Sequence, residues 1–300
     1  PLTLAADVLA PARKVGPALC VRRACGPGPG GEAFPPAGRA GGGSRPAAIC
    51  PIWRRGGPSG LRIQGPMKNQ SAARGPSLSV LIPTHGRGVK LRALLERLRA
   101  QTLAPERFEV IVVDDGSPQP VELAASGYPF ELVLVRQAQA GPGAARNRGL
   151  ERCAAPLVLI LNDDALPASD LCERHLAAQA EVGERCAVLG TFHFTEAARR
   201  SPFVRVLDQS NLLFSFTDLA HGRVHPWSFF WTCNLCLPVA ALREAGGFDA
   251  ERVPEAIVED VELGYRLARQ GWRVVYREEC RAEHDRAFAP AEYLGRSGKL

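Results

Sequence analysis

From Ser77 onward, apolar runs of strand length alternate with segments whose apolar residues recur at helical spacing. Strands are expected at residues 78–83, 108–113, 130–135 and 157–161. Helices are expected at 90–101 and 143–152, and a short helix or turn at 118–126. In the first helix, Leu91, Leu94, Leu95 and Leu98 share one face. This alternation predicts an α/β fold with a mainly parallel, Rossmann-like sheet flanked by helices.

The first 66 residues differ in composition from the rest, because they hold 13 Gly and 11 Pro. Such a segment cannot bury enough apolar surface to offset the entropy cost of ordering it. We therefore expect residues 1–76 to be disordered. Met67 is the single methionine of the chain, which suggests that translation starts there. A genuine basic linker is the alternative.

The formal charge of +6 is unevenly distributed. Residues 1–66 hold nine basic and two acidic side chains, a net of +7, so the remainder carries −1. A neutral body with a basic tail argues against nucleic acid as a partner. The longest aliphatic run, 157–161, is too short to span a membrane, and Asp7 and Pro11 interrupt any secretory signal. We expect a cytoplasmic protein, with peripheral association at the inner face of the membrane left open.

Polar residues follow three of the expected strands. The three segments are Pro83-Thr84-His85, Asp114-Asp115-Gly116-Ser117 and Asn162-Asp163-Asp164. In open α/β sheets, ligands bind outside the carboxyl ends of the strands, so these residues belong at one site. An Asx turn is the ordinary alternative for Asp114 and Asp115. An acidic rim would repel a diphosphate unless a divalent cation intervened, so the pattern predicts a nucleotide held through a metal.

The chain also carries seven motifs in order. They are Ser79-Val-Leu-Ile-Pro-Thr84, Val112-Val-Asp-Asp-Gly-Ser117, Gly141-Pro-Gly-Ala-Ala-Arg-Asn147, Asn162-Asp-Asp164, Thr232-Cys-Asn234, Gly246-Gly-Phe-Asp249 and Glu259-Asp-Val-Glu-Leu-Gly-Tyr-Arg-Leu267. Over about residues 78–285 the chain resembles family 2 glycosyltransferases with the GT-A fold. The resemblance implies a GT-A domain at 77–300, with a nucleotide-sugar half at about 77–165 and an acceptor half at about 166–300. Related chains carry more than the 16 residues that follow His284 here, which predicts a shortened C-terminus.

The resemblance implies roles for residues at the donor end. The backbone of Pro83 and Thr84 and the carboxylate of Asp115 would hold the nucleobase, while Asp114 would support the turn from behind. Arg146 would reach the nucleotide, and Asp163 would lie near the ribose or the sugar. The donor is expected to be a nucleotide diphospho-sugar, with a UDP-sugar as our first choice.

The metal would be Mg²⁺ or Mn²⁺, held by Asp164 and His284. Asn162 departs from the family's Asp-x-Asp motif, which leaves Asp164 as the metal carboxylate. His284 is expected in a short loop after the strand-like run at 274–276. A surface or hydrogen-bonded histidine is the alternative for His284.

On the acceptor side, the resemblance implies that Asp260 is the general base of an inverting transfer to a glycan, a lipid-linked or another hydroxyl acceptor. Glu259 beside it shares this catalytic interpretation, and Glu262 would brace the loop. The alternative is that these acids cap a helix or complement its dipole. Trp231 and Asn234 are expected to line the acceptor side, although core packing explains most aromatic residues nearby.

Three features of the sequence have other interpretations. Gly141-x-Gly143 before a helix is also found in dinucleotide-binding oxidoreductases, although Arg146 stands where a third glycine is usual. Asn162 is compatible with a domain that binds sugar nucleotides without turnover. Cys233-x-x-Cys236 is too little for a zinc site, so reduced, buried thiols are expected.

Overall fold

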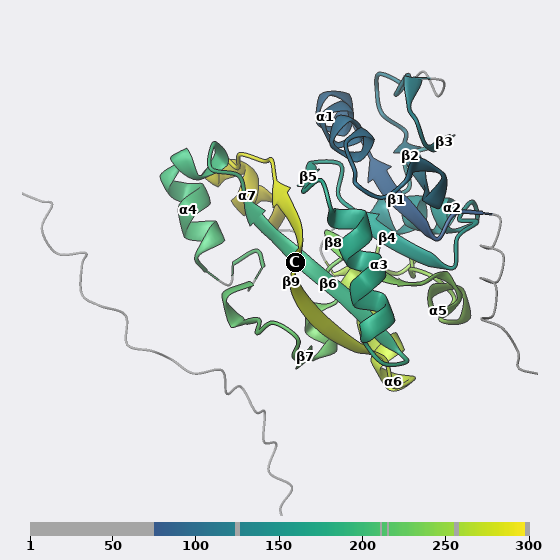
Figure 1. Ribbon diagram of the computed structural model, residues 1–300. Helices are drawn as coiled ribbons and strands as arrows, with labels where there is room; N and C mark the ends of the chain where they lie inside the picture. The colour runs from purple at the N-terminus through teal and green to yellow at the C-terminus, as the bar shows by residue number, and fades with distance from the viewer. Residues whose placement is uncertain (1–74, 124–126, 211, 215, 255–257, 298–300) are drawn as a thin grey trace, which may run out of the picture. The chain divides into compact units, whose positions relative to one another are not determined.

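The computed structural model describes residues 75–123, 127–210, 212–214, 216–254 and 258–297 (Figure 1). The chain divides into two units, Pro1–Pro66 and Met67–Leu300, and every described residue belongs to the second. The expected disorder of residues 1–76 and the expected start at Met67 therefore fall outside the described residues, apart from 75 and 76. No helix in the described ranges is long and apolar enough to cross a membrane.

The first half of the sheet is parallel, as the alternating pattern predicts. Its strands are β1 (Leu78–Thr84), β2 (Phe108–Asp115), β3 (Glu131–Gln137) and β4 (Leu157–Leu161), in the order β3-β2-β1-β4. All three pairings between them are parallel. Every residue of β2 is buried, which is typical of a strand covered on both faces, whereas the edge strand β3 is partly exposed.

The second half of the sheet adds antiparallel pairings to the mainly parallel sheet. Its strands are β5 (Ala165–Pro167), β6 (Cys186–Phe194), β7 (Val224–His225), β8 (Asn234–Pro238) and β9 (Arg273–His284). Strand β8 is antiparallel to both β4 and β6, β6 is parallel to β9, and β5 and β7 are antiparallel to β9. Here loops as well as helices connect the strands, so crossover helices do not impose one direction.

Helices flank this nine-stranded sheet (Figure 1). They are α1 (Gly88–Arg99), α2 (Pro142–Leu150), α3 (Leu171–Glu181), α4 (Pro202–Asp208), α5 (Val239–Glu244), α6 (Glu259–Arg269) and α7 (Pro290–Ser297). The four leucines predicted for the buried face of α1 are fully buried. Residues 118–119 form a bend and 120–123 have no regular structure, so no helix is found in the described part of this segment; 124–126 lie outside the described residues.

Helix α2 packs on β1 and β2, and α3 packs on β6, β8 and β9. Gly149 allows the close approach of α2, because a Cβ at this position would lie 2.1 Å from Leu81 Cδ1. One main hydrophobic core joins the strands to these helices. A smaller cluster of Phe194, Ala198, Val204, Leu207 and Phe288 lies beside it.

Candidate active site

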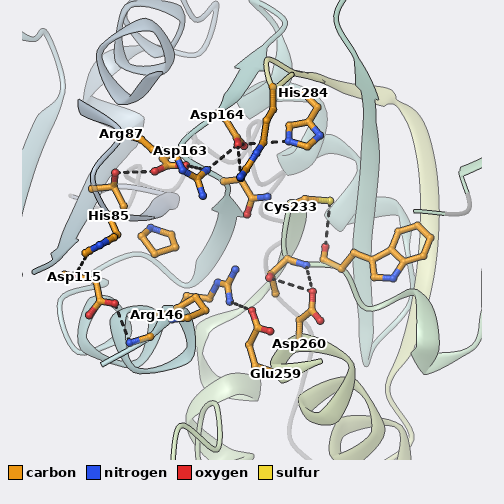
Figure 2. A pocket seen from close by; sticks show the side chains of 18 of the residues that line it. His85, Arg87, Asp115, Arg146, Asp163, Asp164, Cys233, Glu259, Asp260 and His284 are labelled. Atoms are coloured by element: carbon orange, nitrogen blue, oxygen red, sulfur yellow. Dashed lines mark hydrogen bonds and ion pairs between the residues drawn. The ribbon is translucent and has the colours of Figure 1, made fainter. Parts of the chain in front are cut away.

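A cavity of about 550 Å³ lies where β1, β2 and β4 end (Figure 2). The start of α6 and the end of β9 complete its walls. Ten of the eleven residues expected at the site line it: Pro83, Thr84, Asp115, Arg146, Asp163, Asp164, Trp231, Glu259, Asp260 and His284. The parallel strands thus bring motifs from distant parts of the chain to one place, as expected for the carboxyl edge of an α/β sheet.

Asp163 and Asp164, which we call the β4 acidic pair, are buried directly after β4. Thr84 Oγ1 donates a hydrogen bond to Asp163 Oδ2 at 2.8 Å. Arg87 Nη1 donates to both carboxylates, at 2.7 Å to Asp163 Oδ1 and 2.8 Å to Asp164 Oδ2. Burial raises the pKa of Asp163 to about 6, against the lowering effect of Arg87. Burial opposes ionisation of Asp164 too, but His284 and Arg87 hold its pKa below the usual range.

His284 is the last residue of β9, so it lies in a strand and not in the expected loop. Its Nε2 is 3.5 Å from Asp164 Oδ2, and its ring stacks on Phe192 and Phe194. Asp164 Oδ1 and His284 Nδ1 are both buried without a hydrogen-bond partner. A free carboxylate oxygen beside an imidazole fits a divalent cation with two protein ligands. Among the described residues, no three His, Cys, Asp or Glu side chains are arranged to hold a metal by themselves.

Asp114 and Asp115 both hold loops at the end of β2. Asp114 accepts bonds from three donors: Ser117 N, Val121 N and Arg136 Nη1. Asp115 also accepts from three: Gln137 Nε2, Ala140 N and Gly141 N. Asp114 therefore supports the turn, and its pKa is lowered because these bonds outweigh the effect of burial. Asp115 lines the cavity and also fixes the loop that leads into α2.

Arg146 on α2 and Glu259 on α6 form a buried ion pair. Arg146 Nη1 lies 2.7 Å from Glu259 Oε1, and the two side chains are only 5% and 6% exposed. The guanidinium also lies over the Phe248 ring, 5.3 Å from its centroid. Both residues line the cavity, and their pairing fastens the donor side of the cavity to the start of α6.

Asp260 is the second residue of α6, and Glu259 and Asp260 together are the α6 acidic pair. Asp260 Oδ2 accepts from Thr232 N at 3.2 Å and from Thr232 Oγ1 at 3.4 Å, and Oδ1 accepts from Val261 N at 2.8 Å. Burial, followed by the charge of Glu259, raises the pKa of Asp260 to about 6. Val258 and not Asp260 is the N-cap residue, but Glu259 and Asp260 lie in the first turn of α6, where acidic side chains complement the helix dipole.

Glu262, expected to brace the loop, forms an ion pair with Arg266 at 2.7 Å. Arg266 in turn donates to the carbonyl oxygens of Ala245 and Gly247. This contact links α6 to the turn after α5, outside the cavity.

The two residues expected on the acceptor side behave differently. Trp231 lines the cavity and packs against Phe214, Phe216 and Phe229. Asn234 is fully buried outside the cavity lining, which corrects the expectation. Its Oδ1 lies 2.8 Å from His175 Nε2, and its Nδ2 donates to the carbonyl oxygens of Thr191 and Cys280. Asn234 thus ties β8 to β6, β9 and α3.

The structure bears on two alternatives from the sequence, the zinc site and the dinucleotide-binding motif. The six described cysteines are free and buried, and burial raises the pKa of Cys233 and Cys236. Gly141 has a φ of 91°, and a Cβ there would lie 2.0 Å from the carbonyl oxygen of Pro254. Gly141 thus packs against a loop, and Arg146 forms an ion pair with Glu259. In a dinucleotide-binding motif, the glycine at the position of Arg146 would instead let the helix pack closely on the strand.

Sequence reasoning missed two arginines that line the cavity. Arg87 lies in the loop three residues after Thr84, and Arg286 lies two residues after His284. Arg286 Nη1 is 3.7 Å from Asp164 Oδ2. Considering every charged residue close behind a strand end would have included both. The apolar lining residues Leu213, Phe214 and Phe288 were also missed, since no motif marks them.

Comparison with known proteins agrees with this geometry. The profile described as "Glycosyl transferase family 2" matches residues 79–238. Validoxylamine A glucosyltransferase of Streptomyces hygroscopicus subsp. limoneus is 34% identical over 223 residues, which cover 65% of this chain and 49% of that protein. Pre-mycofactocin glycosyltransferase of Mycobacterium tuberculosis is 30% identical over 243 residues, 74% of this chain and 46% of that protein. The chain thus spans about half the length of the curated relatives it matches.

Two solved structures show the same fold. A mannosyltransferase from Pyrobaculum calidifontis, in complex with GDP-Man and Mn²⁺, has a TM-score of 0.52 at 20% identity, covering 76% of this chain and 63% of that one. S. aureus TarS 1–349, in complex with UDP-GlcNAc, has a TM-score of 0.56 at 17% identity, covering 71% and 59%. The family profile covers more than half of the 300 residues. The chain belongs to glycosyl transferase family 2, with the GT-A fold.

Proposed function

We propose that this chain carries the catalytic domain of a glycosyltransferase, which moves a sugar from a nucleotide diphospho-sugar to an acceptor hydroxyl with inversion. One observation carries the proposal: Asp260, a carboxylate with a raised pKa, faces the same cavity as the β4 acidic pair. The names of the sequence relatives support sugar transfer. The nucleotide sugars bound by the structural neighbours support the class of donor.

The donor half, about residues 77–165, supplies the nucleotide site. Pro83, Thr84 and Asp115 line the end of the cavity formed by β1 and β2, where a nucleobase would lie. Asp163 is bonded to Thr84 Oγ1 at the end of β4, next to the place proposed for the ribose and the sugar. The N-terminus of α2 opens towards the same space, which favours a phosphate.

Asp164 and His284 would hold Mg²⁺ or Mn²⁺. Their proximity and the unpartnered Asp164 Oδ1 support this assignment. A bound divalent cation supplies positive charge that offsets the negative charge developing on the leaving diphosphate.

Asp260 would act as the general base. Three donors orient its carboxylate, and its pKa of about 6 leaves it largely ionised at neutral pH while still able to accept a proton. The acceptor oxygen forms a bond to the anomeric carbon as the bond from that carbon to the diphosphate breaks, and the hydroxyl proton passes to Asp260. Glu259 is bound to Arg146, so we assign it to positioning.

The acceptor would bind in the half formed by about residues 166–300, beside Trp231. The candidate acceptors remain a glycan, a lipid-linked sugar or another hydroxyl compound. The aromatic face of Trp231 suits the apolar side of a sugar ring.

The second candidate is a domain that binds sugar nucleotides without turnover, which the neutral Asn162 in the cavity lining favours. The full chain incubated with UDP- and GDP-sugars and Mn²⁺ separates the two candidates. Release of nucleoside diphosphate by the wild-type protein, lost in Asp260→Asn, supports transfer catalysed by Asp260. Tight binding without release in any acceptor mixture contradicts it and favours the binding domain.

A further inference from the structure

Arg87 occupies an unusual position between two carboxylates. A single atom, Nη1, contacts both members of the β4 acidic pair, at 2.7 Å and 2.8 Å (Figure 2). The two aspartates are almost fully buried, but the Arg87 side chain is 39% exposed. It projects from the residue that precedes α1 and lines the cavity.

The neighbouring cations are held in other ways. Arg286 lies 3.7 Å from Asp164, but its Nη2 is bonded to Glu292 at 2.6 Å and its guanidinium lies over Phe288. Lys90, one turn into α1, is paired with Asp285 at 2.7 Å. Within the described residues, the guanidinium of Arg87 bonds only to the β4 acidic pair. Of these three cations, Arg87 can therefore move away from the β4 acidic pair while breaking the fewest other contacts.

Two positive charges compete for the same carboxylate. Adjacent buried carboxylates need a positive counter-ion, since desolvated charge without a partner is costly. A divalent cation at Asp164 would repel a guanidinium 2.8 Å from the same carboxylate. The diphosphate that arrives with the cation offers Arg87 a new partner, and arginine binds phosphate through paired, charge-assisted hydrogen bonds.

We propose that Arg87 is an exchangeable counter-ion of the β4 acidic pair. It neutralises the pair in the empty site, leaves Asp164 when the cation binds, and then pairs with the donor's diphosphate. There it stabilises the charge that develops as the bond from the diphosphate to the sugar breaks. The pairing of Arg87 with the diphosphate rests on the proposed function, whereas the exchange of Arg87 for the cation does not.

The first experiment measures Mn²⁺ binding to the full chain by calorimetry at pH 7.5, with no nucleotide present. Arg87→Gln removes the charge but keeps a polar, though shorter, side chain. We expect Mn²⁺ to bind about tenfold tighter to this variant, because its competitor is gone. Arg92→Gln is the matched control, since Arg92 is an exposed arginine of α1 outside the cavity lining, and it should bind Mn²⁺ as the wild type does.

The second experiment titrates UDP, GDP, ADP and dTDP separately at saturating Mn²⁺. Arg87→Gln should bind the preferred diphosphate about tenfold more weakly, although its metal site is stronger. Arg87→Lys keeps a positive charge without the paired donors, so its affinity should fall between those of the wild type and Arg87→Gln. These opposite changes for metal and nucleotide separate exchange from a general structural defect, and a matched thermal melt checks the fold.

Weaker or unchanged Mn²⁺ binding in Arg87→Gln would overturn the counter-ion proposal. Unchanged nucleotide binding would overturn the diphosphate step. If Arg87→Gln melts well below the wild type, Mn²⁺ binding is measured on Arg87→Lys instead. If this variant has wild-type stability, its lysine should still compete with Mn²⁺, so tighter Mn²⁺ binding than in the wild type would overturn the counter-ion proposal. A wild type that binds none of the four nucleotides contradicts the proposed function and the diphosphate step, while the Mn²⁺ result still tests the counter-ion step.

Discussion

The two acidic pairs of the cavity have the same composition and different surroundings. Each has two adjacent carboxylates and one arginine within hydrogen-bond distance. In the β4 acidic pair, Arg87 contacts both carboxylates and is 39% exposed. In the α6 acidic pair, Arg146 forms an ion pair with Glu259 but not with Asp260, and its side chain is 5% exposed.

We infer from this contrast that the burial of the arginine governs whether an acidic pair can exchange its cation. An exposed guanidinium can be exchanged for another cation at small cost, since water solvates it wherever it moves. A buried guanidinium cannot leave, because its charge would lose both its partner and its solvent. One pair is therefore suited to exchanging a cation. In the α6 acidic pair, Arg146 stays bound to Glu259, and Asp260 is the carboxylate with the raised pKa.

The largest expected effect tests the role of Asp260. Asp260→Asn should lower the transfer rate by roughly 10² to 10⁴, because asparagine cannot take the acceptor's proton. Nucleotide affinity should stay near the wild-type value, as measured by calorimetry on the same preparation. Glu262→Gln on the same helix, outside the cavity, is the control. Normal turnover in a stable Asp260→Asn protein would exclude Asp260 as the base.

The second prediction compares the two arginines directly. Arg146→Met should lower the free energy of unfolding by about 3–5 kcal/mol, because it leaves Glu259 buried and unpaired. Arg87→Met should lower it by less, because Asp164 keeps His284 and Arg286 as neighbours and Asp163 keeps its bond from Thr84. Urea denaturation of both variants provides the measurement. Equal losses would show that the two pairs do not differ as their burial indicates.

The third prediction concerns the cation at the β4 acidic pair. Asp164→Asn should weaken Mn²⁺-dependent binding of a nucleoside diphosphate at least about tenfold, since a metal carboxylate is lost. Asp163→Asn should keep the dependence on Mn²⁺, because Asp163 is assigned to the ribose or the sugar. Calorimetry with and without a chelator distinguishes the two variants. Binding that survives chelation in the wild type would refute the metal role.

The last prediction concerns pH, where the stability changes by no more than about 1.4 kcal/mol per pH unit. The folded state raises the pKa of Asp260 from 3.8 to about 6, so it binds the proton more tightly than the unfolded chain does. The contribution of Asp260 to stability is therefore greatest below about pH 4 and falls as the pH rises to about 6. The stability of Asp260→Asn relative to the wild type should rise across this window, as measured by urea denaturation at each pH. A constant difference would contradict the raised pKa.

Local sequence pattern determined the parallel half of the sheet. The predicted strand at 157–161 coincides with β4, and the four leucines of α1 are buried as predicted. Strands covered on both faces read as continuous apolar runs, and helical faces repeat every three or four residues, so both signals are local. Because parallel strands end at one edge, the residues that follow them could be assigned to one site before the fold was known.

Contacts between distant residues were decided by the tertiary structure alone. Arg87 and Asp163 are 76 residues apart, Arg146 and Glu259 are 113 apart, and His175 and Asn234 are 59 apart. No local pattern shows which arginine meets which carboxylate, or that Asn234 is used inside the sheet. The direction of β8 was equally hidden, since a short strand pairs either way until its neighbours are in place. The sequence therefore determined which groups meet at the cavity, and packing decided which of their charges are exposed enough to be exchanged.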